Sequence, residues 1–218
     1  MKSMLPRVII WLLCMSFVNA TEKSYQPQHG DIVFQSLPNP WGKDLVDMIE
    51  GATGSPYSHC GMVIIEEGKW QVIEAIGPVQ MIPLEAWQAR GRGKKIWAYR
   101  PVEKFRKSIP NMVKVMKKDL GKPYDIRYRL DSENIYCSEL LYRGWKEVTG
   151  KPLGKLVKLH ELNWQPYRKI IVAIEGSEEI PLQREIITPR DLAQAHELTQ
   201  VWPIPETQQQ GVKKKLQK

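Results

Sequence analysis

Apolar residues in the first half of the chain form short runs separated by turn residues, a pattern that is typical of β-strands. Residues 61–65 and 70–76 flank a short polar turn and predict a β-hairpin. With residues 67 and 68 at the centre of that turn, residue 62 lies opposite residue 73. Three further strands are predicted, at residues 30–35, 79–84 and 96–102. Pro101 suggests that the last of these lies at a sheet edge.

Further along the chain, apolar residues have the spacing of amphipathic helices. They recur three or four positions apart over residues 109–120, with lysines on the opposite face, and Gly121 ends the run. A second run of this kind extends from Cys137 to about residue 149, and its apolar stripe consists of Leu140, Leu141, Trp145 and Val148. Other helices are predicted at residues 41–51, at 85–90, after Pro166 and at 191–198. Strands and helices segregated in this way predict an α+β fold.

The N-terminal residues 1–20 have the pattern of a secretory signal peptide. Lys2 and Arg7 precede an apolar segment at residues 8–18, and residues 18–20 fit the small-residue cleavage pattern. A retained membrane anchor is the alternative, but this segment is shorter than the ~20 residues that span a bilayer. We therefore expect export to the periplasm or the extracellular space. A single folded domain at residues 21–206 and a flexible basic tail at 207–218 complete the predicted organisation.

The chain is basic, with 32 Lys and Arg against 24 Asp and Glu and a formal net charge of +8. Loss of Lys2 and Arg7 with the signal peptide lowers this charge by two, and the tail carries four of the remaining lysines. In an exported protein, such a surface favours peripheral contact with anionic envelope material and does not indicate a nucleic-acid partner. The composition indicates neither a cofactor nor an oligomeric state.

Export would leave Cys60 and Cys137 as the cysteines of the mature chain. They could form one disulfide, which is the main structural alternative to catalysis. Cys137, however, lies in the first turn of a predicted helix, where unpaired N–H groups and the helix dipole favour the thiolate. Cys137 is therefore a candidate nucleophile, although many free cysteines in proteins are buried and inert.

A nucleophilic thiol needs a base within hydrogen-bond reach and a third group that orients the base. His59 begins the first strand of the predicted hairpin, and the expected register places Glu74 one diagonal step away on the same face. A charged residue in an otherwise apolar strand also needs a partner. Glu74 could therefore hold the tautomer of His59, while the same alternation directs Cys60 to the opposite face.

These side chains are also of the types that bind zinc. No pair of them has the short spacing that marks a zinc site, and residues on opposite faces of a strand cannot easily share one ion. The sequence therefore predicts no metal site.

Five short motifs occur in order along the chain, at residues 30–34, 57–62, 74–79, 120–125 and 136–139. Together with export, this order of His, Glu and Cys resembles the permuted papain-like cysteine hydrolases of the NlpC superfamily, in particular the YiiX/YebB-type branch. The resemblance implies a circularly permuted papain-like fold, in which an antiparallel sheet packs against the helix that bears the cysteine. It also implies that Cys137 is the nucleophile, His59 the general base and Glu74 the orienting residue.

Tyr124 is similar in position to a tyrosine that related enzymes carry upstream of the nucleophile. It is the candidate second donor to the oxyanion, beside the Cys137 N–H group, or a substrate contact. A packing role for this tyrosine is the alternative.

Three hypotheses for the function follow. The first is cleavage of an amide bond in the peptides of peptidoglycan, through a Cys-His-Glu triad and a thioester intermediate. The second is hydrolysis or transfer of a lipid acyl group by the same triad, and the third is a non-catalytic envelope-binding domain. The pocket lining separates the first two, because an acyl chain needs apolar walls and a peptide stem needs placed charges.

Overall fold

The computed structural model describes residues 24–39 and 45–205. The predicted signal peptide and basic tail lie outside the described residues, as does the start of the helix predicted at residues 41–51. Within the described part of the chain, no helix is both long and apolar enough to cross a membrane.

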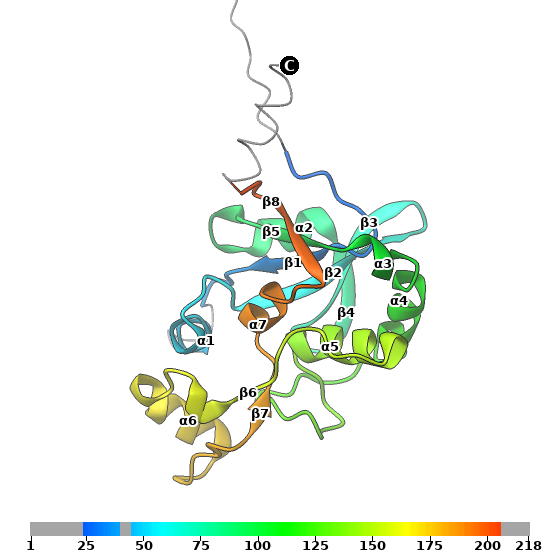
Figure 1. Ribbon diagram of the computed structural model, residues 1–218. Helices are drawn as coiled ribbons and strands as arrows, with labels where there is room; N and C mark the ends of the chain where they lie inside the picture. The colour runs from blue at the N-terminus through cyan, green and yellow to red at the C-terminus, as the bar shows by residue number, and fades with distance from the viewer. Residues whose placement is uncertain (1–23, 40–44, 206–218) are drawn as a thin grey trace, which may run out of the picture.

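Six strands form one antiparallel sheet in the order β4-β3-β2-β1-β5-β8 (Figure 1). The predicted α+β fold with an antiparallel sheet is confirmed, because the short apolar runs of the chain pair as strands and helices cover the sheet that they form. The strands are Ile32–Gln35 (β1), His59–Glu66 (β2), Lys69–Ala75 (β3), Val79–Pro83 (β4), Trp97–Pro101 (β5) and Leu198–Trp202 (β8).

The hairpin of β2 and β3 has the predicted register, in which Met62 pairs with Ile73. Glu67 and Gly68 occupy the turn with φ angles of 50° and 75°. Two central residues with positive φ are typical of the tight turns whose twist matches that of the flanking strands. Because side chains alternate along a strand, this register decides which face of the sheet each functional residue takes.

Helices pack on both faces of the sheet (Figure 1). On one face, α4 (Ile109–Lys117) and α5 (Cys137–Thr149) pack over an apolar core that includes Phe34 and Met62. On the other face, α2 (Leu84–Arg90) buries Trp87 against the valines of the central strands. The amphipathic helices predicted around residues 109–120 and 137–149 are therefore confirmed, and each buries its apolar stripe.

A smaller layer lies beyond the start of α5 (Figure 1). It contains a two-stranded sheet and the helix predicted after Pro166, which is α6. The elements outside the main sheet and its covering helices are α1 (Leu45–Thr53), α3 (Glu103–Arg106), β6 (Val157–Lys158), α6 (Arg168–Glu175), β7 (Glu185–Ile186) and α7 (Pro189–Ala193). Single helical turns lie at Arg92–Lys94, Leu159–Glu161 and Gln165–Tyr167.

Two predictions near the last strand are wrong. The helix expected at residues 191–198 is the short α7, which Pro189 begins early, and Leu198 already belongs to β8. Pairing with β5 takes precedence over the helical spacing there. β5 is also not an edge strand, since β8 pairs on its outer side; Pro101 is tolerated because β1 pairs with β5 only as far as Tyr99.

Candidate active site

Cys137 is the first residue of α5 and is 2% exposed, so its position at a helix start is confirmed. The N–H groups at this end of the helix have no partner within the helix. The N–H of Tyr136 donates to Glu139 Oε2 at 3.3 Å, and Ser138 Oγ donates to the Ile187 carbonyl at 2.8 Å. These bonds hold the first turn in place and so determine where the sulfur lies.

His59 begins β2, where its ring is buried beside both other members of the predicted triad. Its Nε2 lies 2.6 Å from Glu74 Oε2, as the diagonal placement in the hairpin predicts. Its imidazole also hydrogen-bonds the Cys137 sulfur, and Nδ1 is the ring nitrogen left for that bond. The structure therefore brings thiol, imidazole and carboxylate together in one row.

The Glu74 carboxylate is fully buried and surrounded by hydrogen-bond donors. Trp87 Nε1 and Arg90 Nη2 donate to Oε2 at 2.8 and 2.5 Å, and Gln80 Nε2 and Arg90 Nη1 donate to Oε1 at 2.9 Å. The sequence analysis missed these three residues. A buried carboxylate signals that donors exist, but only the packing of α2 on the sheet shows which residues they are.

These contacts set the charges of the row. Burial disfavours a charged imidazole, but hydrogen bonds to Cys137 and Glu74 outweigh it and raise the pKa of His59 to about 9. Burial acts against the Glu74 carboxylate as well, yet His59 and Arg90 lower its pKa to about 2. Hydrogen bonds from Cys60 and then His59 lower the pKa of Cys137 well below its usual range. The row is therefore built to hold a thiolate beside an imidazolium.

Cys60 lies on the opposite face of β2 from His59, in the core under α5, as predicted. Both cysteines are free thiols, so the disulfide considered from the sequence is absent. The Cys60 side chain nevertheless hydrogen-bonds Cys137, and burial together with this bond raises the pKa of Cys60. Cys60 is thus a neutral donor to the candidate nucleophile, a contact that strand alternation alone did not predict.

Two tyrosines lie close to Cys137. The hydroxyl of Tyr124, which the sequence analysis named, hydrogen-bonds the Cys137 sulfur. Tyr128, which it missed, packs edge-on against Tyr124 with ring centroids 6.2 Å apart. Tyr128 lines the cavity described below, whereas Tyr124 is not part of the cavity wall.

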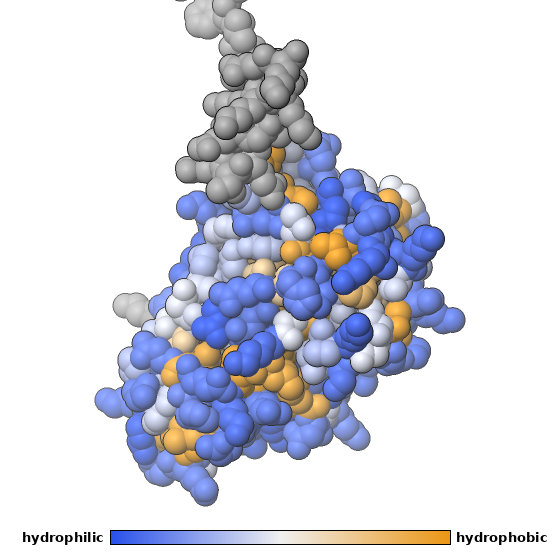
Figure 2. Space-filling view, viewed as in Figure 1, coloured by the Kyte–Doolittle hydropathy of each residue, from blue (hydrophilic) through white to orange (hydrophobic). Residues whose placement is uncertain are grey.

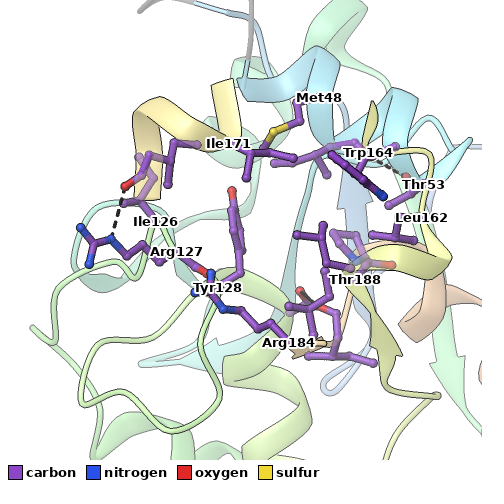
Figure 3. A pocket seen from close by; sticks show the side chains of 18 of the residues that line it. Met48, Thr53, Ile126, Arg127, Tyr128, Leu162, Trp164, Ile171, Arg184 and Thr188 are labelled. Atoms are coloured by element: carbon purple, nitrogen blue, oxygen red, sulfur yellow. Dashed lines mark hydrogen bonds between the residues drawn. The ribbon is translucent and has the colours of Figure 1, made fainter. Parts of the chain in front are cut away.

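A cavity that Cys137 helps to line lies between α1, α6 and the loop that precedes α5. Figure 3 shows much of its wall. In the space-filling view, apolar side chains gather over the region of β6, β7 and α6 (Figure 2). Among the described residues of the wall, those that carry charge are Arg127, Glu175 and Arg184, and Arg184 pairs with Glu175 at 2.5 and 3.0 Å. The apolar wall consists of Met48, Ile49, Ala52, Ile126, Leu159, Leu162, Trp164, Ile171, Ile174, Ile186, Ile187 and Pro189.

The side chains around Cys137, His59 and Glu74 do not fit a metal centre. Within residues 24–39 and 45–205, no group of three or more His, Cys, Asp or Glu side chains is arranged to hold a metal ion. The His59 Nε2 atom and both Glu74 oxygens are already occupied by protein hydrogen bonds.

A buried thiol at a helix start, with an imidazole and then a carboxylate in line behind it, defines the papain-like thiol hydrolases. Residues 26–202 match a family described as "Permuted papain-like amidase enzyme, YaeF/YiiX, C92 family", and the chain belongs to this family. The predicted permuted papain-like fold, the YiiX-type resemblance and the enzyme class, a papain-like amidase, are thereby confirmed.

Two relatives from Escherichia coli extend over most of the chain. The uncharacterized protein YiiX of strain K12 is 32% identical over 202 residues, which are 88% of this chain and 96% of that protein. A crystal structure described as metalloprotein yiiX from strain O157:H7 superimposes with a TM-score of 0.74 at 31% identity. That superposition covers 81% of this chain and 97% of the E. coli chain.

Proposed function

We propose that this protein is an exported amidase that releases the acyl group of an N-acylated compound of the cell envelope. The observation that carries the proposal is the apolar cavity beside Cys137, about 90 Å³ in volume, whose wall suits the first methylenes of an acyl chain with its carbonyl carbon next to the sulfur. Each methylene transferred from water to such a wall contributes about 0.8 kcal/mol. A chain of several methylenes would therefore bind with useful affinity.

The cavity wall gives less support to a peptidoglycan stem as the substrate. A stem peptide carries carboxylates and an ammonium group, and burying an unpaired charge is costly. In the wall, Arg184 and Glu175 already neutralise each other, and Arg127 is exposed to solvent. The acyl hypothesis is therefore preferred here, and the peptide hypothesis stays a prediction that the same experiment tests.

The proposed mechanism uses the row in order. The Cys137 thiolate attacks the carbonyl carbon, an S–C bond forms, and the oxyanion accepts a hydrogen bond from the Cys137 N–H. The His59 imidazolium then gives its proton to the leaving nitrogen as the C–N bond breaks. Water attacks the resulting thioester with His59 as its base, which releases the carboxylic acid and restores the thiolate. Glu74 keeps the imidazole ring in position through both steps.

The test compares the protein without residues 1–20 with its Cys137→Ala variant. Both are incubated with N-acyl amino acids, a phospholipid extract and digested peptidoglycan, and products are identified by mass spectrometry. We expect free fatty acid from the N-acyl amides only when Cys137 is intact. Cys137-dependent peptide fragments would instead favour the peptidoglycan hypothesis, and no Cys137-dependent product in any pool would favour an envelope-binding role.

Acyl-chain length provides a second measurement. If the chain enters the cavity, kcat/KM should rise roughly fourfold per added methylene until the cavity is full. A flat series from four to twelve carbons would mean that the chain stays in solvent. Export is tested separately by mass spectrometry of the secreted protein, for which a mature N terminus near Thr21 is expected.

A further inference from the structure

Tyr128 combines two unusual features. Its φ angle is 54°, a left-handed backbone conformation that is uncommon for a bulky residue. Its hydroxyl oxygen is buried, and in the part of the chain that the structure describes its proton has no acceptor, because the neighbouring Tyr124 hydroxyl interacts with it only as a donor. Most buried hydroxyl groups are hydrogen-bonded, and a phenylalanine would fill the same space without leaving a polar atom unpaired.

The strained backbone is held in place by a buried carboxylate. Asp125 Oδ1 accepts the N–H of Arg127 at 3.0 Å, and Asp125 Oδ2 accepts the N–H of Arg129 at 3.3 Å. The N–H of Tyr128 itself donates to the Asp125 carbonyl at 3.1 Å. Asp125 therefore holds the residues on both sides of Tyr128, as expected where a strained conformation is maintained at a functional site.

The direction of the ring is also determined by its neighbours. Tyr128 packs edge-on against Tyr136, with ring centroids 5.2 Å apart and an interplanar angle of 75°. The Tyr136 hydroxyl in turn accepts the N–H of Ile187 at 3.1 Å, so this neighbour is itself held in place. The Tyr128 ring projects from its loop into the cavity, and Ile171 and Thr188 lie on the surrounding walls (Figure 3).

The Tyr128 hydroxyl is a proton donor that has no acceptor among residues 24–39 and 45–205. Burial, and then the negative charge of Cys137, raises the pKa of Tyr128, so the phenol stays protonated wherever the thiolate is present. Tyr124 differs in this respect, because its hydroxyl already interacts as a donor with the Tyr128 oxygen and the Cys137 sulfur. An oxygen atom carried into the cavity by a substrate would supply the missing acceptor for Tyr128.

We propose that Tyr128 is a catalytic residue whose hydroxyl donates a hydrogen bond to the oxygen of the acyl group that Cys137 attacks. Together with the Cys137 N–H, it would stabilise the oxyanion, the role for which the sequence had suggested Tyr124. This inference rests on the proposed function, because it assumes that an acyl carbonyl enters the cavity. In this assignment Tyr124 acts on the sulfur and not on the substrate.

The first test compares Tyr128→Phe with Tyr124→Phe, a matched pair that removes one hydroxyl from each ring. With an N-acyl amide, Tyr128→Phe should lower kcat about 100-fold and change KM less than about threefold. Its thermal midpoint should not fall, since the proton of the lost hydroxyl had no acceptor in the part of the chain that the structure describes. Unchanged kcat, a loss in KM alone, or a larger kcat loss in Tyr124→Phe than in Tyr128→Phe would overturn the assignment.

The second test does not require turnover. Octanal adds to Cys137 as a hemithioacetal: the sulfur bonds to the aldehyde carbon, and the oxygen carries the former carbonyl pair and a proton. Protection of Cys137 from iodoacetamide measures this adduct, with octanol as the control ligand of the same chain length that has no carbonyl group and cannot bond to the sulfur. Tyr128→Phe should weaken octanal protection by a factor close to its loss in kcat and leave octanol binding nearly unchanged.

The two measurements separate the two proposals. If the wild-type protein cleaves no N-acyl amide but Tyr128→Phe still weakens the octanal adduct, the proposed function fails and the donor role stands. If the wild-type protein does cleave N-acyl amides while octanal protects both proteins equally, the donor role fails and the proposed function stands.

Discussion

The two sides of Cys137 differ in how completely their polar atoms are paired. On the sheet side, both oxygens of the buried Glu74 accept hydrogen bonds, and His59 bridges this carboxylate to the sulfur. On the cavity side, the wall is mostly apolar, and the proton of the Tyr128 hydroxyl has no acceptor among the described residues. Paired groups set the ionisation of the candidate nucleophile, whereas an unpaired group is available to a substrate. Under the proposed function, the sheet side prepares the chemistry and the cavity side selects what is cleaved.

The strongest way to disrupt the paired side is Glu74→Gln. The amide cannot neutralise Arg90, and its NH₂ group would face donors, so we expect kcat/KM to fall about 10²–10⁴-fold. Breaking a buried ion pair should also lower the free energy of unfolding by about 3–5 kcal/mol. Steady-state kinetics and urea denaturation measure the two effects.

Gln80→Ala is the matched control, because it removes one neutral donor from Glu74 and keeps the ion pair. It should lower kcat/KM less than about tenfold. If Glu74→Gln were no worse than this control, the carboxylate would not be the group that orients His59.

The pH dependence of kcat/KM tests the sheet side of Cys137 further. As pH rises through the lowered pKa of Cys137 the thiolate forms, and above about 9 His59 loses the proton that the leaving amine needs. The profile of kcat/KM should therefore rise at a pH below the ordinary thiol range and decline above about 9, tenfold per unit on each outer limb. In Glu74→Gln the alkaline limb should move to lower pH, because Glu74 helps to raise the pKa of His59. An alkaline limb that did not move would show that Glu74 does not raise the pKa of His59.

The cavity side is tested by filling it. Ala52 lies in the apolar wall on α1, and Ala52→Phe would occupy space otherwise open to the acyl chain. The ratio of kcat/KM for a twelve-carbon over a four-carbon substrate should fall at least about tenfold, the loss of roughly two buried methylenes. Ala173→Phe makes the same change at an exposed position of α6 and should leave this ratio unaltered. Equal ratios in the two variants would show that the chain does not use this cavity.

The difference between the two sides also explains what the sequence could predict. The placement of His59 beside Glu74 follows from the register of one tight hairpin, and Cys137 from a helix start, so local rules suffice. Their partners Trp87 and Arg90 come from α2, whose docking on the sheet is a long-range event without a local signal. The cavity depends on segments more than 100 positions apart in sequence, such as α1 and α6.

Tyr128 illustrates a further limit of sequence analysis. A tyrosine in a polar loop gives no indication of a positive φ angle, and that angle becomes visible only with the hydrogen bonds of Asp125. Tyr124 drew attention because of a resemblance to related enzymes, and the structure does bring it to the Cys137 sulfur. Which of the two tyrosines lines the cavity is decided by tertiary packing alone.

The smallest expected effect concerns Cys60, which lies on the core side of the sheet and still contacts the nucleophile. Its thiol donates a hydrogen bond to Cys137, so Cys60→Ala should raise the pKa of Cys137 toward the ordinary range. Loss of one such bond, worth about 1 kcal/mol, should slow alkylation of Cys137 by iodoacetamide roughly fivefold at a pH below the pKa of Cys137. Cys60→Ser keeps a donor of similar size and should slow alkylation less. If both variants react at the wild-type rate, Cys60 does not lower the pKa of Cys137. The contact with His59 would then account for the thiolate, and the buried thiol of Cys60 would only fill space in the core.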